Sequence, residues 1–550
     1  MRTFYTVFFI ATLGLTGLLP NMVWSQEDTD SHKGIRIAWD YSSMHQLAER
    51  GGYPRLTRLQ DSTLLLIYET RTGDIHLKQS TDHGMTWTAP ITVFSRFVYS
   101  NLEGKSTIVH TANPEIKQLQ NGDIVIACNY RPQQAEIAPY TIVVRRSVDN
   151  GKTWLSPQNL YTAAPRFGDG CWEPAFLQLP NGELQVYFAN ENPYQHSDEQ
   201  EISMLRSADN GVTWSDTPTT VSFRKDRRDG MPVPQIIDQE IVVAIEDNKI
   251  DQFKPYTVRT SLQENWANPI LSDSPERDYA LLDPIKDSVY MGAPYFIKLP
   301  NGQTLISYQT NENRAHDWEL STMEVAVGDC AAKNFGQRSR PFDVPLDKEA
   351  KWNALALWDD QTVVALSSSN FRSTEVAPWL IKGHIIPSSI SATRQKAEYP
   401  IFIGAKGKTN VKAGIQVDDK NLYLNCILSQ VPDRSVSERN WIYTFLYVDG
   451  SLLKIICDDT GQKSLWVYEK EKWEPSNLVD KIDVEIHRSP QDQSTNLHFR
   501  IPKTIRENKA WTSLKLGLAL SAYDVSKGRY TERLADMDEE NPNTWLNIKL

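Results

Sequence analysis

Short apolar runs separated by polar turns follow one another along most of the chain. The runs have the length of β-strands, as at residues 124–128 and 184–188. Asn-Gly pairs bound several of them, at Asn121-Gly122, Asn181-Gly182 and Asn301-Gly302. Because Asn and Gly tolerate the positive φ of tight turns, this pattern predicts β-hairpins.

The hairpin pattern is periodic. A residue followed by proline and an apolar run recurs at Pro54, Pro114, Pro174, Pro232 and Pro294, and a sixth instance without proline stands at Trp352-Asn353. The successive spacings are 60, 60, 58, 62 and 59 residues. Such a period predicts one structural unit repeated six times over about residues 35–388, as in a propeller or a solenoid.

A second phrase, S-x-D-x-G-x-T-W, occurs at residues 80–87, 147–154 and 207–214, with a degenerate version at 261–266. Its Ser and Asp can bond local backbone amides, its Gly can take a positive φ, and its Trp can pack inward. The phrase would close a second hairpin, and two hairpins make a four-stranded blade. It resembles the Asp-box of sialidase-type propellers. We therefore predict an all-β chain with a six-bladed β-propeller, although Asp-boxes alone carry no chemistry.

The last 160 or so residues lack both repeats. Strand-like runs at residues 401–403, 422–428, 441–448 and 514–520 predict a C-terminal β-sandwich. The runs at 414–417, 418–424 and 441–450 diffusely resemble the family 9 carbohydrate-binding modules; the alternative is a sandwich that only supports the propeller. The expected domains are a propeller at 26–390 and a sandwich at 391–550, the latter a candidate sugar binder.

The first 25 residues have the features of a secretory signal peptide, with cleavage expected after Ser25. No other long apolar run occurs, so we expect no membrane span and a secreted or periplasmic, monomeric protein. The formal net charge is −11, and −12 once Arg2 leaves with the signal, which argues against nucleic acid as a partner. The five cysteines are too scattered for a disulfide framework.

The sequence has no cluster with metal-ligand spacing, no Gly-rich phosphate loop and no G-x-S-x-G motif. We therefore expect neither a metal nor a cofactor.

The repeat itself predicts where side chains converge. In a propeller the innermost strand of each blade starts at the ligand face and its partner ends there, so pre-proline residues and the ends of the second runs meet in one central pit. Glu173 is the one acid at a pre-proline position, and Glu246 closes the second run of the fourth unit. Two converging carboxylates suit glycoside hydrolysis. The structural alternative is that each acid caps a strand or pairs with Arg131, Arg166 or Arg228.

The stretches 53–59, 172–187 and 242–246 resemble family 93 of the glycoside hydrolases, the exo-arabinanases. The resemblance covers the propeller and implies a retaining enzyme that releases arabinobiose from the non-reducing end of α-1,5-arabinan. It places the catalytic glutamates at Glu173 and Glu246, with Glu173 assigned as acid/base and Glu246 as nucleophile. The candidate contacts to this oligo- or polysaccharide substrate are Tyr53, Arg55, Tyr130, Arg131, Trp172, Asn190, Glu191, Asp247, Tyr295 and Asn311, and Glu69 and Glu312 are weaker candidates.

Two other functions remain open. A sialidase, or another enzyme of sugar acids, would need three arginines around the pit, but Gly52 stands where the first-blade arginine of sialidases belongs. A non-catalytic glycan-binding propeller would leave Glu173 and Glu246 far apart or fixed in salt bridges.

Overall fold

The computed structural model describes residues 34–249, 251–392, 399–404, 409–429, 439–506, 511–524, 528–534 and 537–550. The predicted signal peptide, residues 1–25, lies outside these ranges. None of the helices in the described ranges is long and apolar enough to cross a membrane.

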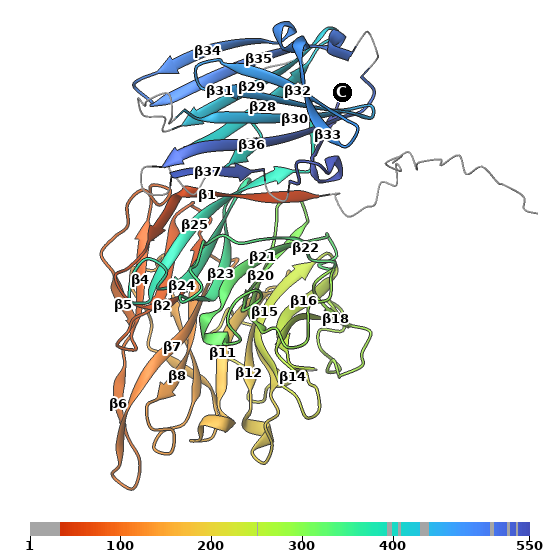
Figure 1. Cartoon of the computed structure of the whole chain (residues 1–550). Coiled ribbons are helices and arrows are strands. Elements are labelled where there is room, and N and C mark those ends of the chain that lie inside the picture. The colour runs from red at the N-terminus through yellow and green to blue at the C-terminus, as the bar shows by residue number, and fades with distance from the viewer. Residues whose placement is uncertain are drawn as a thin grey trace, which may run out of the picture.

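Six antiparallel sheets make up the first part of the described chain (Figure 1). Their innermost strands contact one another in sequence order, and the last contacts the first, so the sheets form a closed ring. These inner strands are β2 (Gly52–Arg58), β7 (Ser106–Gln118), β11 (Cys171–Gln178), β15 (Asp229–Ile237), β19 (Met291–Lys298) and β23 (Ala350–Asp359). The predicted all-β propeller fold is confirmed, and six sheets make up this ring in the described chain.

Each blade continues outward through hairpins. The second strands are β3 (Leu64–Glu69), β8 (Ile124–Pro132), β12 (Leu184–Asn190), β16 (Glu240–Asp247), β20 (Thr304–Thr310) and β24 (Thr362–Ser369). The third are β4 (Ile75–Ser80), β9 (Thr141–Ser147), β13 (Glu201–Ser207), β17 (Lys254–Ser261), β21 (Thr322–Gly328) and β25 (Ala377–Pro387). The outermost of the first five blades are β5 (Ile91–Phe94), β10 (Gln158–Thr162), β14 (Thr219–Ser222), β18 (Arg277–Tyr279) and β22 (Gly336–Ser339), and blade 2 gains β6 (Phe97–Ser100) on its inner side.

Blade 6 is closed by the start of the chain. Strand β1 (Ile35–Gln46) pairs antiparallel with β25 and so supplies the outermost strand of that blade. Residues more than 300 positions apart are thereby paired, as Ile35 is with Pro387. The repeat in the sequence begins after β1 and did not reveal this closure.

The six pre-proline positions share one unusual conformation. Their φ angles lie between 49° and 55° at Tyr53, Asn113, Glu173, Met231, Ala293 and Trp352, which we call the bulge ring. Every inner strand also shifts register against its partner at this position. A β-bulge with a left-handed residue re-aims the side chain. Tyr53, Met231 and Ala293, from three different blades, pack together beside Trp352, so the ring converges on the propeller axis.

The Asp-boxes take the predicted turn geometry in the first three blades. In blade 1, the amide of Gly84 donates to Ser80 Oγ at 2.8 Å, and that of Thr86 donates to Asp82 Oδ1 at 2.9 Å. The same bonds recur in blades 2 and 3. Hydrogen bonds from Thr and Ser lower the pKa of each of the three Asp residues to about 2. Because each turn joins a third strand to a fourth, it lies at the end of the propeller opposite the bulge ring.

Two further sheets form the predicted β-sandwich. One contains β26 (Ser389–Ser391), β30 (Trp441–Val448), β31 (Ser451–Asp458), β32 (Lys463–Glu469), β33 (Lys472–Ser476), β36 (Leu514–Asp524), β37 (Gly528–Arg533) and β38 (Leu546–Lys549). The other contains β27 (Ile401–Ile403), β28 (Asn410–Val417), β29 (Asn421–Ser429), β34 (Asp483–Ser489) and β35 (Ser494–Pro502).

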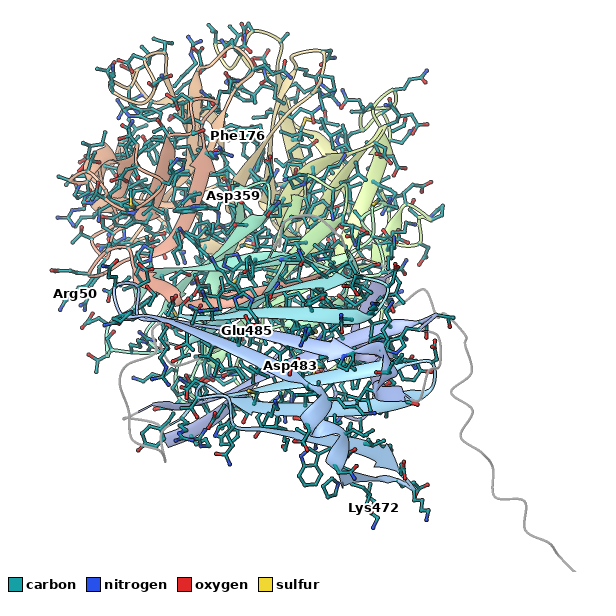
Figure 2. The ribbon with its side chains drawn as sticks, turned by 90° about the horizontal axis from the view of Figure 1, so that it is seen from above. Arg50, Phe176, Asp359, Lys472, Asp483 and Glu485 are labelled. Atoms are coloured by element: carbon teal, nitrogen blue, oxygen red, sulfur yellow. The ribbon has the colours of Figure 1, made fainter. Side chains whose placement is uncertain are left out.

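The sandwich packs against blade 6. Figure 1 shows it lying over β1 and β25, and its apolar core includes Ala38 from β1 and Ile386 from β25. The ring centres of His384, on β25, and Phe402, on β27, lie 4.2 Å apart where the two domains meet. Lys472, by contrast, lies at the end of the sandwich remote from Phe176 in the propeller (Figure 2).

Candidate active site

Glu173 occupies the bulge ring on β11, with its side chain half-buried. Burial raises the pKa of this carboxyl to about 8, and the nearby charge of Glu246 adds to the rise. The positive charges of Arg131 and Arg228 oppose it. Among the described residues no cation forms an ion pair with Glu173. The group is therefore largely protonated near neutral pH and keeps part of its surface open to a ligand.

Glu246 lies on the second strand of blade 4, opposite Gly230 in the register. Its Oε2 accepts a hydrogen bond of 2.7 Å from the amide of Ala293 in blade 5. Burial raises the pKa of Glu246 to about 7, while the Ala293 amide and the charge of Arg228 lower it. A Cβ on Gly230 or on Gly292 would come within 2.9 Å of a Glu246 carboxylate oxygen. Two glycines thus make room for this acid.

The bond from Ala293 to Glu246 belongs to a series around the ring. Bulge-ring amides also donate to side chains of the preceding blade's second strand: Tyr53 to Ser368 at 2.7 Å, Asn113 to Glu69 at 3.3 Å and Trp352 to Gln309 at 2.8 Å. Ser368, Glu69, Gln309 and Glu246 are therefore equivalent positions. The propeller uses one bulge in every blade, and in blade 4 the residue that accepts the bond is an acid beside Glu173.

Tyr290 adds a hydroxyl next to Glu246. Gln309 Nε2 donates to Tyr290 Oη at 2.9 Å, and Gln309 Oε1 is already engaged by the Trp352 amide. The hydroxyl oxygen of Tyr290 therefore accepts from Gln309, and its own proton is directed elsewhere. A Cβ added to Gly292 would lie within 2.6 Å of both Tyr290 Oη and Glu246 Oε2, so these two oxygens are close neighbours. Burial, together with the charge of Glu246, raises the pKa of Tyr290 well above its usual value, so it remains a donor.

Glu191 holds the loop that carries Glu173. This buried carboxylate accepts hydrogen bonds from the Gly170 amide at 3.1 Å and from Trp172 Nε1 at 2.9 Å, and it pairs with Arg228. Its oxygens are thus committed to protein groups. Glu191 positions Trp172 and Arg228, the residues that border Glu173.

Two exposed aromatic side chains lie near the acids, next to different blades of the bulge ring. Phe167, in the 3₁₀ turn Phe167–Asp169, packs 5.4 Å from Trp172. Trp318, in the turn Trp318–Leu320, lies 5.9 Å from Tyr290 and 6.3 Å from Trp352. Their exposed fractions are 59% and 41%. Flat exposed rings of this kind suit stacking on a sugar.

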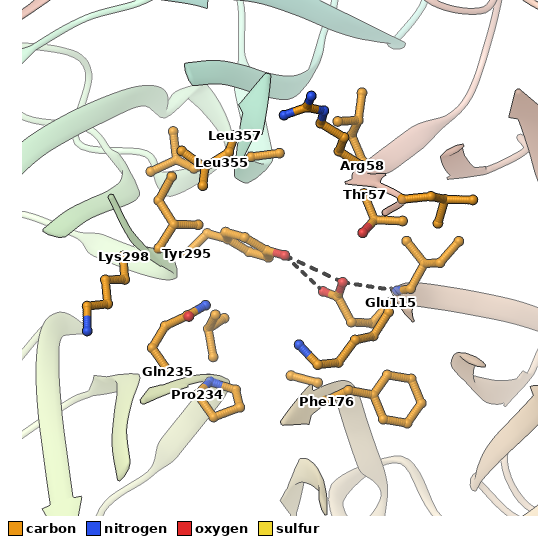
Figure 3. A pocket seen from close by; sticks show the side chains of 18 of the residues that line it. Thr57, Arg58, Glu115, Phe176, Pro234, Gln235, Tyr295, Lys298, Leu355 and Leu357 are labelled. Carbon is orange, nitrogen blue, oxygen red and sulfur yellow. Dashed lines mark hydrogen bonds between the residues drawn. The ribbon is translucent and has the colours of Figure 1, made fainter. Parts of the chain in front are cut away.

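Arg55 and Tyr295 lie one layer deeper in the channel. Arg55 Nε donates to Glu115 Oε2 at 3.2 Å, and the Arg55 guanidinium stacks on the rings of Tyr53 and Tyr295 at 4.0 and 4.9 Å. The Tyr295 hydroxyl contacts both Glu115 oxygens at 3.3 and 3.4 Å (Figure 3). These groups form a floor beneath Tyr53 of the bulge ring.

The structure places the other predicted contact residues as follows. Asp247 is fully buried and pairs with Arg224 and Arg277. Asn190 donates to Ser203 and Tyr161, and Asn311 accepts from the Tyr290 amide. Tyr130 packs edge-on against Phe97, and the Arg131 guanidinium lies 5.5 Å from the Trp172 ring centre. Tyr53, Trp172 and Arg131 are the predicted contacts that border the acids.

No protein-family model matches the chain, and no curated protein matches it in sequence. Among solved structures it is similar to an α-L-arabinofuranosidase from Fusarium graminearum bound to an iminosugar inhibitor (15% identity, TM-score 0.44, 64% of this chain and 97% of that one). It is similar to an α-L-arabinanase from Penicillium chrysogenum complexed with arabinobiose (16%, 0.41, 64% and 98%). A Trypanosoma rangeli sialidase mutant aligns over 90% of this chain and 93% of its own (12%, 0.39). At these identities and TM-scores the likenesses assign no activity.

Four residues at the site were not predicted: Tyr290, Gln309, Phe167 and Trp318. Gln309 had a usable signal, because it follows its bulge-ring residue by sixteen positions, as Glu69 and Ser368 follow theirs. The other three lie outside the repeated strands, where the period carries no information. Within the described residues, no group of three or more His, Cys, Asp or Glu side chains is placed to hold a metal.

Proposed function

We propose that this protein is a retaining exo-glycosidase that hydrolyses α-1,5-arabinan from its non-reducing end and releases arabinobiose. The observation that carries the proposal is that Glu173 and Glu246 are two half-buried acids with raised pKa values, and that the charge of Glu246 raises the pKa of Glu173. Among the described residues neither acid has an ion-pair partner. A pair with raised pKa values shares about one proton near neutrality. This is the state in which a glycosidase needs its two carboxyl groups.

The roles follow from the two environments. Glu173 has the higher pKa, of about 8, and acts as the acid that protonates the leaving glycosidic oxygen. Glu246 has its carboxylate stabilised by the Ala293 amide, and it attacks the anomeric carbon to form a glycosyl–enzyme ester. Glu173 then accepts a proton from the water that attacks this carbon and frees Glu246. Retention follows from the resemblance to family 93.

The surroundings favour a neutral glycan over a sugar acid. A sialidase would use three arginines around the substrate carboxylate, whereas Arg55 is engaged with Glu115 below Tyr53, and Gly52 replaces the first-blade arginine. Arg131 and Arg228 are the two arginines whose charges act on Glu173. A purely binding propeller would have these glutamates fixed in salt bridges, and the described residues provide none for either acid.

The proposed setting is extracytoplasmic, after removal of residues 1–25, with a monomeric chain whose propeller carries the activity. For the sandwich we propose a sugar-binding surface at Trp466 and Trp473, two partly exposed rings whose centres lie 5.6 and 4.4 Å from the ammonium of Lys454. The test compares arabinan binding by the inactive Glu246→Gln variant with binding by the double variant Glu246→Gln/Trp473→Ala. Loss of the Trp473 ring should weaken binding if the surface holds sugar.

The deciding experiment is hydrolysis of linear α-1,5-arabinan by the mature chain, with a sialoside as the rival substrate and products separated by chromatography. Wild-type protein should release arabinobiose, and Glu173→Gln and Glu246→Gln should each abolish release. NMR of the first product should show the α-anomer if the reaction retains configuration. Turnover that survives both substitutions would remove these residues from the mechanism, and cleavage of the sialoside alone would favour the sialidase alternative.

A further inference from the structure

A cavity occupies the end of the propeller channel opposite the bulge ring. Its volume is about 570 Å³, and all six inner strands contribute to its wall (Figure 3). Glu115 and Tyr295 close it on the side of the bulge ring, as part of the floor described above. The cavity is therefore separate from Glu173 and Glu246, and its size is that of a small-molecule site.

The cavity carries an excess of positive charge. Lys117, Lys298 and Arg58 line it, whereas Glu115 is the one carboxylate among its lining residues. Glu115 is already held by Arg55 and by the Tyr295 hydroxyl. Among the described residues, the ammonium groups of Lys117 and Lys298 have neither an ion pair nor a hydrogen bond. Two half-buried cations without partners in one concavity, on a chain of net charge −11, concentrate positive potential there.

The rest of the wall selects the kind of anion. Phe176, Val233 and Leu355 offer apolar surface, and Thr57 and Gln235 offer polar atoms. Gln235 Nε2 is bonded to the Phe296 carbonyl, which leaves its carbonyl oxygen as an acceptor for a hydroxyl. An inorganic ion would fill a small part of the volume and leave the apolar wall wet. A larger anion with hydroxyl groups and an apolar face uses all three kinds of surface.

We propose that this distal cavity binds a small hydroxylated organic carboxylate, of the sugar-acid type, with its carboxylate on Lys117. Burial lowers the pKa of Lys117, and a bound carboxylate would offset the cost of its charge. The site is independent of the proposed hydrolysis, because the Arg55–Glu115–Tyr295 floor lies between the two ends of the channel.

The test is isothermal titration of the mature chain with D-glucuronate at low ionic strength, with D-glucose and inorganic phosphate as comparison ligands. Wild-type protein should bind glucuronate in preference to both. Lys117→Met keeps the length of the side chain without its charge and should weaken binding about tenfold or more, whereas Lys117→Arg should retain it. Lys472→Met, on the remote end of the sandwich, is the matched control and should change nothing.

Three results would overturn the proposal: absence of glucuronate binding to wild type, equal binding of glucose or phosphate, or full binding by Lys117→Met. Lys117→Gln provides a second charge-removing variant should Lys117→Met fail to fold, as judged by its melting temperature. A further control adds arabinobiose. If it displaces glucuronate, the ligand lies at the glutamate pair and the distal site is wrong.

Discussion

A hydrogen bond of 2.7 Å joins the Ala293 amide to the Glu246 carboxylate across the boundary between blades 4 and 5. The amide is available because Ala293 adopts the left-handed conformation of the bulge ring, with φ of 49°. The same bulge is occupied by Glu173 in blade 3. One repeated backbone feature thus places the proposed acid/base on one blade and stabilises the carboxylate form of the proposed nucleophile on another.

The protonation of the pair predicts a bell-shaped pH profile. Glu246 must be ionised, which requires a pH above its pKa of about 7, and Glu173 must be protonated, which requires a pH below about 8. We expect kcat/KM on arabinan to peak between these values and to fall on both sides. Glu173→Gln, assayed with a substrate whose leaving group needs no protonation, should lose the basic limb. A maximum near pH 5 would contradict the assigned states.

The same shifts predict how stability depends on pH. A carboxyl whose pKa rises on folding binds its proton more tightly in the folded state, so its destabilising effect is absent below the unfolded pKa of about 4.5 and grows as pH rises to about 8. Glu173→Gln removes this ionisation. Its melting temperature should therefore exceed that of wild type by more at pH 8.5 than at pH 5. An equal difference at both pH values would show that Glu173 does not titrate in this window.

Two Asp-box glycines form a natural comparison. Gly151 and Gly84 both have positive φ, of 80° and 75°, so alanine at either site costs about 1–2 kcal/mol in backbone strain. A Cβ on Gly151 would meet its nearest neighbours at 3.8 Å, but one on Gly84 would run into the Trp358 ring of blade 6. Gly84→Ala should therefore lose about 1–3 kcal/mol more than Gly151→Ala. Denaturant unfolding measures both, and equal losses would refute the blade 1–blade 6 contact.

The repeats made the propeller predictable, because each period carries its own turn signals. Pro174 and its equivalents marked the inner strands, and the Asp-box phrase marked the third-to-fourth turns. The closure by β1 was not predictable in this way, since residues 35–46 carry neither mark and their pairing with β25 depends on the completed ring.

For the site, the sequence repeat predicted that Glu173 and Glu246 lie near one another. It could not predict which residues lie at the open end of the channel and which lie in the floor below. Arg55 and Tyr295 each lie two residues after their bulge-ring residue, past the register shift, and their side chains meet in the floor instead of at the open end. Asp247 follows Glu246 directly and points to the other side of the sheet, into its ion pairs with Arg224 and Arg277. The bulge decides where these side chains point. The sequence does not reveal its left-handed φ, because the residues that adopt it are of six different types and none is glycine.

The Arg55–Glu115 pair should be important for stability. Both side chains are largely buried, with 4% and 11% of their surface exposed, so removal of one leaves an uncompensated charge in the channel. We expect Glu115→Ala to destabilise the protein by about 3–5 kcal/mol. Glu375, which pairs at the surface with Arg50 and Arg71, is the control, and Glu375→Ala should cost under about 1 kcal/mol. Figure 2 shows Arg50 at the edge of the propeller. If Glu115→Ala and Glu375→Ala lose similar free energies of unfolding in chemical denaturation, the Arg55–Glu115 pair is open to water.

The orientation of Gln309 gives Tyr290 a defined role at the acids. The Trp352 amide fixes Gln309 Oε1, Nε2 therefore donates to Tyr290 Oη, and the tyrosine proton is left for Glu246 or for a substrate oxygen between them. Tyr290→Phe should lower kcat about tenfold or more and move the acidic limb of the pH profile to higher pH, because the Glu246 carboxylate loses a nearby donor. The measurement is the pH dependence of kcat and kcat/KM on arabinan.

Tyr308→Phe is the control in the same blade. That hydroxyl contacts Glu324 at 3.3 Å in a separate buried network, so its loss should affect stability and leave the pH profile unchanged. Should Tyr290→Phe instead raise KM alone, with both limbs in place, Tyr290 would contact substrate without acting on Glu246. If wild type turns over arabinan and Tyr290→Phe is indistinguishable from it, the hydroxyl proton of Tyr290 points neither to Glu246 nor to the substrate.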